Sequence, residues 1–231
     1  MSQSGRAPQT SALEKGSAAR AEFLRSGPPA ASTLRPSYGL KDLLWMVGDR
    51  ANGCVLDLGP AWQSTLTFFL DRGFRVCAED PLSEWNEYQA REEAAARDLD
   101  PGAAPAPLDP LWLASSFLEE ALQFPAESVD AALAWSIFDH ASDELAAALA
   151  ARLYEILRPG GCILAIFQPQ PPKSCQRYRI ASGGIELLPN TAPASFSRVF
   201  QNREILRLFE KFRSAKTYVG RDQIREGLFI K

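Results

Sequence analysis

Short apolar runs alternate with helix-forming stretches through most of this sequence, and the alternation limits the possible folds more than any other feature. Four apolar runs have the length of buried strands, at 54–58, 74–78, 129–137 and 162–167. The stretches 83–99 and 142–157, rich in Ala, Glu, Leu and Arg, are typical of helices. Strands separated by helices need crossover connections, so the pattern predicts an α/β fold with a mostly parallel sheet and right-handed crossovers.

The last third of the chain has a different pattern. Residues 178–180 and 185–188 flank Gly183-Gly184, which predicts a β-hairpin. An amphipathic helix is expected over 202–212. After it, 216–219 and 227–230 are joined by a polar segment short enough for an antiparallel pair of strands. The stretch 111–121 fits either a short strand or a helix.

Composition divides the chain into a tail and a domain. Residues 1–35 are rich in Ala, Ser, Pro and Gly without apolar periodicity, which predicts a flexible N-terminal tail. Residues 36–231 are then one domain, in which 169–200 form an insertion. No apolar run approaches the roughly 20 residues of a membrane-spanning helix, so we expect no membrane partner. The net charge of -3 argues against nucleic acid as a partner.

The few cysteine and histidine residues argue against a metal site. None of the four cysteines belongs to a Cys-x-x-Cys pair, and His140 is the single histidine. Cys54, Cys77 and Cys162 each occupy an apolar run, where a cysteine behaves as a small buried hydrophobe. Free thiols indicate a reduced compartment, so we expect a cytoplasmic protein.

The segment Val55-Leu56-Asp57-Leu58-Gly59-Pro60-Ala61 resembles the strand-and-loop motif Asp-x-Gly-x-Gly-x-Gly of the class I S-adenosylmethionine-dependent methyltransferases. A glycine after the first strand permits a sharp turn and close approach of a ligand. The following helix N-terminus favours a carboxylate. The resemblance implies that the cofactor S-adenosylmethionine is bound here by four residues: Asp57, Gly59, Pro60 and Ala61.

A second motif of this family ends the next predicted strand. In Val76-Cys77-Ala78-Glu79-Asp80, an acidic residue stands where the family binds both ribose hydroxyls of the cofactor. The two oxygens of a carboxylate suit a vicinal diol. The resemblance assigns this role to Asp80, with Glu79 as its rival.

Two further segments complete the resemblance. The approach Phe124-Pro125-Ala126-Glu127-Ser128-Val129-Asp130 is similar to the entry to the family's fourth strand, where Asp130 would be structural. The turn Leu157-Arg158-Pro159-Gly160-Gly161 is similar to the entry to its fifth strand. The implied fold is a Rossmann-like, doubly wound, mostly parallel seven-stranded sheet with an antiparallel C-terminal strand.

The resemblance implies a transferase, an S-adenosylmethionine-dependent methyltransferase whose methyl acceptor is a small molecule or a protein. The segment from Trp135 to His140 would face the transferred methyl group, with Trp135 at the cofactor. His140 is the candidate general base, and Asp139 would orient it or act itself. The insertion 169–200 would cover the substrate, and its cations Lys173, Arg177 and Arg179 would line the rim.

Two alternatives stay open. Ala61 and Gln63 stand where the family's motif has its second and third glycines, so a methyltransferase-like interaction module without catalytic activity is one alternative. The other is a nicotinamide-linked Rossmann enzyme. The loop lacks the glycines that a pyrophosphate requires, and antiparallel C-terminal strands fit that class poorly.

Overall fold

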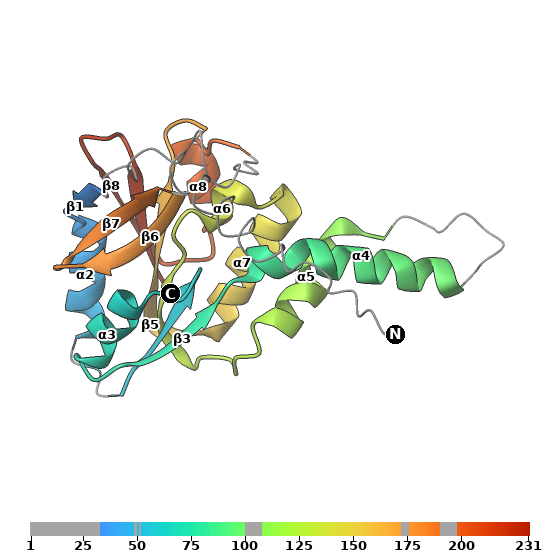
Figure 1. Cartoon of the computed structure of the whole chain (residues 1–231), viewed down its shortest axis with the longest axis horizontal. Coiled ribbons are helices and arrows are strands. Elements are labelled where there is room, and N and C mark those ends of the chain that lie inside the picture. The colour runs from blue at the N-terminus through green and yellow to red at the C-terminus, as the bar shows by residue number, and fades with distance from the viewer. Residues whose placement is uncertain (1–32, 49, 51, 100–107, 172–175, 190–197) are drawn as a thin grey trace, which may run out of the picture. The chain divides into compact units, whose positions relative to one another are not determined.

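The computed structural model describes residues 33–48, 50, 52–99, 108–171, 176–189 and 198–231 (Figure 1). Most of the predicted tail and the cation Lys173 lie outside these residues. The last three residues of the predicted tail do not, because Thr33–Arg35 form a strand, β1, that pairs with another strand of the domain. Within the described residues, regular structure therefore begins at Thr33, three residues before the predicted start of the domain.

The main sheet contains six strands within the described residues, in the order β3-β2-β4-β5-β9-β8. These are β3 (Arg75–Glu79), β2 (Cys54–Leu58), β4 (Val129–Leu133), β5 (Leu157–Phe167), β9 (Arg225–Ile230) and β8 (Ser214–Val219). The first four are parallel, and β9 runs antiparallel to both of its neighbours. The predicted parallel sheet with an antiparallel closing pair is confirmed, and the carboxyl ends of four strands meet at one edge.

The predicted number of seven strands is wrong for the described part of the chain. The ambiguous stretch 111–121 belongs to a helix, α5 (Pro110–Ala121). Asp109 caps this helix by accepting hydrogen bonds from the backbone N–H groups of Leu111 and Trp112. Pro110 occupies the first turn, where its missing N–H costs nothing, so local sequence signals favour the helix.

Helices cover both faces of the sheet and enclose two apolar clusters (Figure 1). The helices α2 (Tyr38–Val47) and α3 (Gln63–Leu70) pack on one face. The other face is covered by α4 (Pro81–Leu99), α5, the short α6 (Ile137–His140), α7 (Asp143–Ile156) and α8 (Asn202–Leu208). This is the doubly wound arrangement that the sequence predicted.

A second sheet of three antiparallel strands contains β1, β7 (Gly184–Pro189) and β6 (Gln176–Ala181). The predicted hairpin is β6–β7, and its two turn residues, Ser182 and Gly183, have φ values of 50° and 78°. Positive φ at both positions is typical of the type I′ turn, whose twist matches that of the flanking strands. Residues 176–189 of the predicted insertion 169–200 therefore form a regular hairpin.

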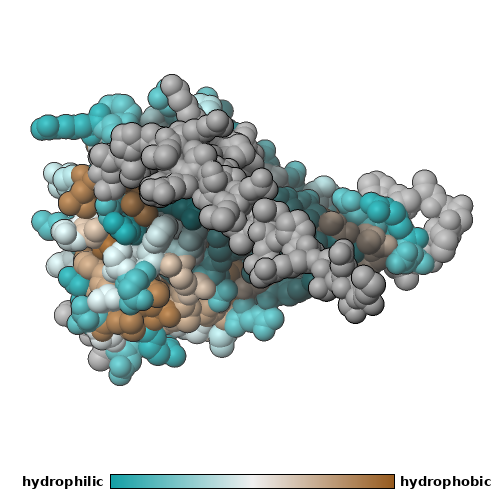
Figure 2. All heavy atoms as spheres, viewed as in Figure 1, coloured by the Kyte–Doolittle hydropathy of each residue, from teal (hydrophilic) through white to brown (hydrophobic). Residues whose placement is uncertain are grey.

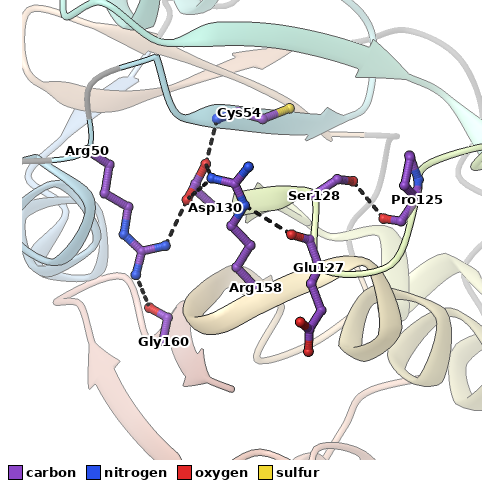
Figure 3. A network of polar contacts seen from close by, with 8 residues as sticks. All are labelled: Arg50, Cys54, Pro125, Glu127, Ser128, Asp130, Arg158 and Gly160. Atoms are coloured by element: carbon purple, nitrogen blue, oxygen red, sulfur yellow. Dashed lines mark hydrogen bonds and ion pairs between the residues drawn. The ribbon is translucent and has the colours of Figure 1, made fainter.

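Asp130, at the start of β4, has the structural role predicted for it (Figure 3). Its carboxylate is fully buried and accepts hydrogen bonds from Arg50 (2.7 Å), from the backbone N–H of Cys54 (2.8 Å) and from Arg158 (3.3 Å). Arg50 also donates to the carbonyl oxygen of Gly160 at 3.0 Å. One carboxylate thus ties together the entries to three neighbouring strands, at the edge of the sheet opposite its parallel carboxyl ends.

A second buried carboxylate of the framework belongs to Glu226 in β9, which is 2% exposed. It accepts hydrogen bonds from the Ser37 hydroxyl (2.7 Å) and from the backbone N–H of Gly39 (2.8 Å), and it forms an ion pair with Arg35 at 3.0 Å. Ser37 caps α2. Glu226 therefore fixes β1 and the start of α2 to the last strand of the sheet.

Candidate active site

A pocket of about 250 Å³ lies beyond the carboxyl ends of β2, β3 and β4. Ligands of open α/β sheets bind at this edge. The residues that line it come from these strand ends, from the start of α4, from α6 and from β6: Leu58, Gly59, Pro60, Asp80, Leu82, Ser83, Trp135, Ser136, Ile137, His140, Gln176, Arg177 and Tyr178. Five of the predicted site residues line this pocket: Gly59, Pro60, Asp80, Trp135 and His140.

Asp57 lies next to the pocket, as the second-to-last residue of β2, and its side chain is completely buried. One carboxylate oxygen accepts a hydrogen bond from the indole N–H of Trp135 at 2.5 Å. The other oxygen has no hydrogen-bond partner among the described residues. Burial raises the pKa of Asp57 to about 7, although the Trp135 hydrogen bond lowers it. Such a carboxylate is a strong acceptor for a cationic donor.

Trp135 follows β4 and is held between the first loop and the hairpin. Its ring stacks on that of Tyr178, with centroids 5.8 Å apart and planes 5° from parallel. A Cβ atom at Gly59 would lie 3.1 Å from Cδ1 of Trp135. Gly59 does not have a positive φ, so the expected turn conformation is not why glycine stands there. The close indole ring leaves little room for a Cβ atom there.

Asp80, at the end of β3, lines the pocket, whereas its rival Glu79 does not. Burial raises the pKa of Asp80, and a backbone hydrogen bond from Ser83 and the charge of Arg177 partly oppose this. Burial and the nearby Glu84 carboxylate also raise the pKa of Glu79. A partly desolvated carboxylate beside an open pocket suits a neutral donor such as a hydroxyl, so the geometry favours Asp80 over Glu79.

The loop after Gly59 does not fill the pocket. Ala61 is exposed and does not line it, and Gln63 is an exposed residue at the start of α3. The Gln63 amide donates a hydrogen bond to the Thr67 hydroxyl at 3.0 Å, along the helix and away from the loop. The glutamine that replaces the family's third glycine therefore adds no side chain to the pocket.

The two predicted catalytic residues are placed differently. His140, the last residue of α6, lines the pocket. Asp139 is completely buried and does not line it. One Asp139 oxygen accepts a hydrogen bond from the backbone N–H of Gln168 at 2.8 Å, and burial raises the pKa of Asp139 to about 7. Asp139 thus lies behind the pocket wall and holds the end of β5.

Sequence reasoning missed the contribution of the hairpin to the pocket wall beyond the cation Arg177. Tyr178, 3% exposed, bonds through its hydroxyl to the Gln168 side chain and to Gln176. The backbone N–H of Ile180 donates to the buried hydroxyl of Thr65, in the first turn of α3, at 3.0 Å. No local motif links β6 to α3, more than 100 residues apart in the chain, so only tertiary structure reveals these contacts.

Two other kinds of site are absent from the described part of the chain. No group of three or more His, Cys, Asp or Glu side chains there could hold a metal ion. None of the described helices has both the length and the apolar character needed to cross a bilayer.

Comparisons with known proteins found similar structures but no close relatives. No protein-family model matches the sequence, and no curated protein matches it. A 1,6-didemethyltoxoflavin-N1-methyltransferase from Burkholderia thailandensis is 18% identical over 98% of this chain and 93% of its own, with a TM-score of 0.48. An S-adenosylmethionine-dependent methyltransferase from Mesorhizobium loti is 16% identical over 83% of this chain and 96% of its own, with a TM-score of 0.47.

A TehB-like S-adenosylmethionine-dependent methyltransferase from Corynebacterium glutamicum is 13% identical over 95% of this chain and 98% of its own, with a TM-score of 0.45. Function depends on the site rather than on the fold, so these identities leave the activity to be argued from the residues of the pocket. The order of the six described strands, with β9 antiparallel between β5 and β8, is the arrangement that the sequence predicted, apart from the seventh strand.

Proposed function

We propose that this protein is an S-adenosylmethionine-dependent methyltransferase whose cofactor site is formed by Asp57, Gly59 and Asp80. The observation that supports this best is the Asp57 carboxylate, which is completely buried and has one oxygen without a described partner. A buried carboxylate without a cation is costly. The ammonium group at the amino-acid end of S-adenosylmethionine is a cation that would satisfy it.

The rest of the pocket is consistent with the other end of this cofactor. Asp80 stands at the end of the neighbouring strand, lines the pocket and would accept hydrogen bonds from the ribose hydroxyls. The apolar side chains of Leu58, Leu82 and Ile137 also line the pocket and would contact the adenine. A pocket with apolar walls and a few polar groups is typical of small-molecule sites.

S-adenosylmethionine supplies an electrophilic methyl group on a sulfonium sulfur. The chain then has to align an acceptor with this group and exclude water. His140 lines the pocket and would take a proton from an acceptor that must lose one. We assign Asp139 a positioning role, because it is buried behind the wall and holds Gln168. The hairpin over the pocket favours a small-molecule acceptor over a protein.

Calorimetry with S-adenosylmethionine and S-adenosylhomocysteine tests the cofactor site. We expect both ligands to bind, and Asp57→Asn and Asp80→Ala each to weaken binding by roughly tenfold or more, as for the loss of a charged hydrogen bond. The matched control is Asp71→Asn, at the exposed C-cap of α3, which should bind like the wild type. Absence of binding at millimolar ligand would refute the proposal.

The alternative is an interaction module that binds no cofactor. It is favoured by the Trp135 indole, which already bonds to Asp57, and by β6, which bonds to the first turn of α3. On this alternative both ligands fail to bind the folded wild-type protein, so the same calorimetry separates the two functions.

A further inference from the structure

The Trp135 indole lies against the residue that the proposed function needs most. It is 6% exposed, and its N–H donates to Asp57 at 2.5 Å. Cδ1 of the same ring is so close to Gly59 that a Cβ atom there would lie 3.1 Å from it. The indole therefore lines the pocket and contacts both Asp57, which does not line it, and the glycine of the loop.

The hairpin holds the indole in this place. Tyr178 stacks on its ring nearly in parallel, and the Tyr178 hydroxyl bonds to Gln168 and Gln176. The backbone N–H of Ile180, two residues further along β6, bonds to Thr65 at 3.0 Å. A ligand group that takes the place of the indole N–H on Asp57 therefore disturbs a stacked pair that is fixed from behind.

We propose that Trp135 is a specificity-determining residue that competes with the ammonium group of the ligand for Asp57, so that it weakens the binding of ligands that carry this group and leaves nucleosides without one unaffected. This inference rests on the proposed function. The indole offers one neutral donor, whereas an ammonium offers three donors and a positive charge. An ammonium and a carboxylate also attract each other as full charges, so an ammonium offsets the cost of the displacement.

A nucleoside such as 5′-methylthioadenosine has the adenine, the ribose and the sulfur of the cofactor but lacks its amino-acid part. It can contact Asp80 and the apolar walls, but it has no ammonium group that could bind to Asp57. Displacing the indole would leave Asp57 without any partner, and a buried charged group without a partner is costly. The proposal therefore predicts that 5′-methylthioadenosine leaves the Trp135 hydrogen bond in place.

The indole N–H signals in ¹H–¹⁵N correlation spectra report this bond directly. Trp135→Phe identifies the Trp135 signal by its absence and keeps a ring against Tyr178. We expect S-adenosylhomocysteine to move the wild-type Trp135 signal upfield as the bond to Asp57 breaks, and 5′-methylthioadenosine to leave it unmoved. The signal of Trp45, which is 84% exposed on α2, is the internal control and should respond to neither ligand.

The affinities of both ligands for wild type and Trp135→Phe complete the test. In the variant no bond has to break, so we expect S-adenosylhomocysteine to bind roughly tenfold more tightly and 5′-methylthioadenosine to bind with unchanged affinity, and the ratio of the two affinities to rise by the same factor. If S-adenosylhomocysteine binds while the Trp135 signal stays in place, or if the ratio is unchanged, the inference is overturned and the proposed function stands. If neither ligand binds either protein, the proposed function itself fails.

Discussion

Asp57 and Asp130 are both completely buried, but their surroundings have opposite effects on them. Burial alone would raise the pKa of Asp130, yet the hydrogen bonds from Arg50 and Cys54 and the charges of Arg158 and Arg50 bring it below the usual value. Asp57 has one neutral donor and no cation, so its pKa rises to about 7. Donors and cations within the protein balance the charge of Asp130, whereas the charge of Asp57 would be balanced only by a bound ligand.

The Asp57 carboxyl should make stability fall as the pH rises from 5 to 8. The native carboxyl keeps its proton up to about pH 7, whereas in the unfolded chain it is released near pH 4. The folded state therefore binds more protons in this range, and its free energy of unfolding decreases as the pH rises. Asp139, whose pKa is also raised to about 7, adds to the same decrease.

Asp57→Asn should remove part of this decrease, on the order of 2–3 kcal/mol between pH 5 and 8. Urea denaturation at both pH values measures it. Asp139→Asn should remove a second part, and the exposed Asp71→Asn should leave the decrease unchanged. Equal pH dependence in wild type and Asp57→Asn would show that Asp57 is already ionised at pH 5.

Asp130→Ala should destabilise the protein by about 3–5 kcal/mol, because it leaves a partly buried Arg50 and a buried N–H of Cys54 without their shared acceptor. The control is Glu120→Ala, which breaks an exposed ion pair with Arg91 and should cost less than about 1 kcal/mol. Chemical denaturation at pH 7 compares them. Similar losses in both variants would contradict the structural role of Asp130.

At the scale of elements, the β6–β7 hairpin brings Tyr178 and Gln176 to a pocket otherwise built from the ends of the main sheet. The position of this hairpin depends on its hydrogen bonds to the rest of the domain, among them the one from Ile180 to Thr65 and the pairing of β7 with β1. The two-residue turn between its strands therefore matters for the register of every pocket residue on β6.

Gly183→Ala should destabilise the hairpin by roughly 1–2 kcal/mol, because its φ of 78° lies in the left-handed region, which disfavours residues with a Cβ atom. An added Cβ would meet nothing within 4 Å, so any loss reflects backbone conformation alone. Ser182→Asn should have the opposite effect, since Asn-Gly is the preferred pair in a type I′ turn. Hydrogen exchange at the β6–β7 amides measures both. Unchanged exchange in both variants would contradict this account of the turn.

At the scale of the whole domain, the main sheet separates two apolar clusters that share its strands. Figure 2 shows apolar residues scattered among hydrophilic ones on the side that carries α2 and α3, where Tyr38, Trp45 and Leu70 are exposed. The clusters themselves are closed, with Phe69 buried in one and Phe138 in the other. Because both clusters pack on the same strands, we expect the two faces of the sheet to unfold together.

Phe69→Ala and Phe138→Ala should each lower the free energy of unfolding by about 3–5 kcal/mol. In each variant both faces of the sheet should still unfold in one cooperative transition. Far-ultraviolet circular dichroism and aromatic near-ultraviolet signals, followed through urea denaturation, check whether the two curves coincide. Trp45→Ala, which removes an exposed ring, should change stability by about 0.5 kcal/mol or less. Separate transitions in either Phe variant would show that the two faces unfold independently.

The sequence predicted the strands of the main sheet well because their apolar runs and glycine turns are local signals. Cys54–Leu58 has the bounds that were expected, and the closing pair β8–β9 is confirmed. The strand expected over 129–137 ends at Leu133, because Ile137 begins α6. A continuous apolar run cannot distinguish a buried strand from the buried helix that follows it.

The candidate site was predictable only where a residue lies at the end of a strand or in the segment directly after it. Asp57 and Asp80 came from strand ends and His140 from the segment after β4, and their roles stay predictions. The stacking of Tyr178 on Trp135 joins residues from β6 and the end of β4 through a hairpin that no motif places. Conversely, the glutamine at 63 looked obstructive in sequence, but the structure directs its side chain along α3.

The Glu226 contacts also bear on how the chain folds during its synthesis. The cap of α2 is completed by a bond between residues 187 positions apart, from Gly39 to Glu226. At roughly 5–20 residues per second, a ribosome needs on the order of 10–40 s to make the intervening chain. Until Glu226 has been made, three groups lack the acceptor that they share, namely the Ser37 hydroxyl, the Gly39 N–H and the Arg35 guanidinium. The first helix of the domain therefore reaches its native environment among the last elements.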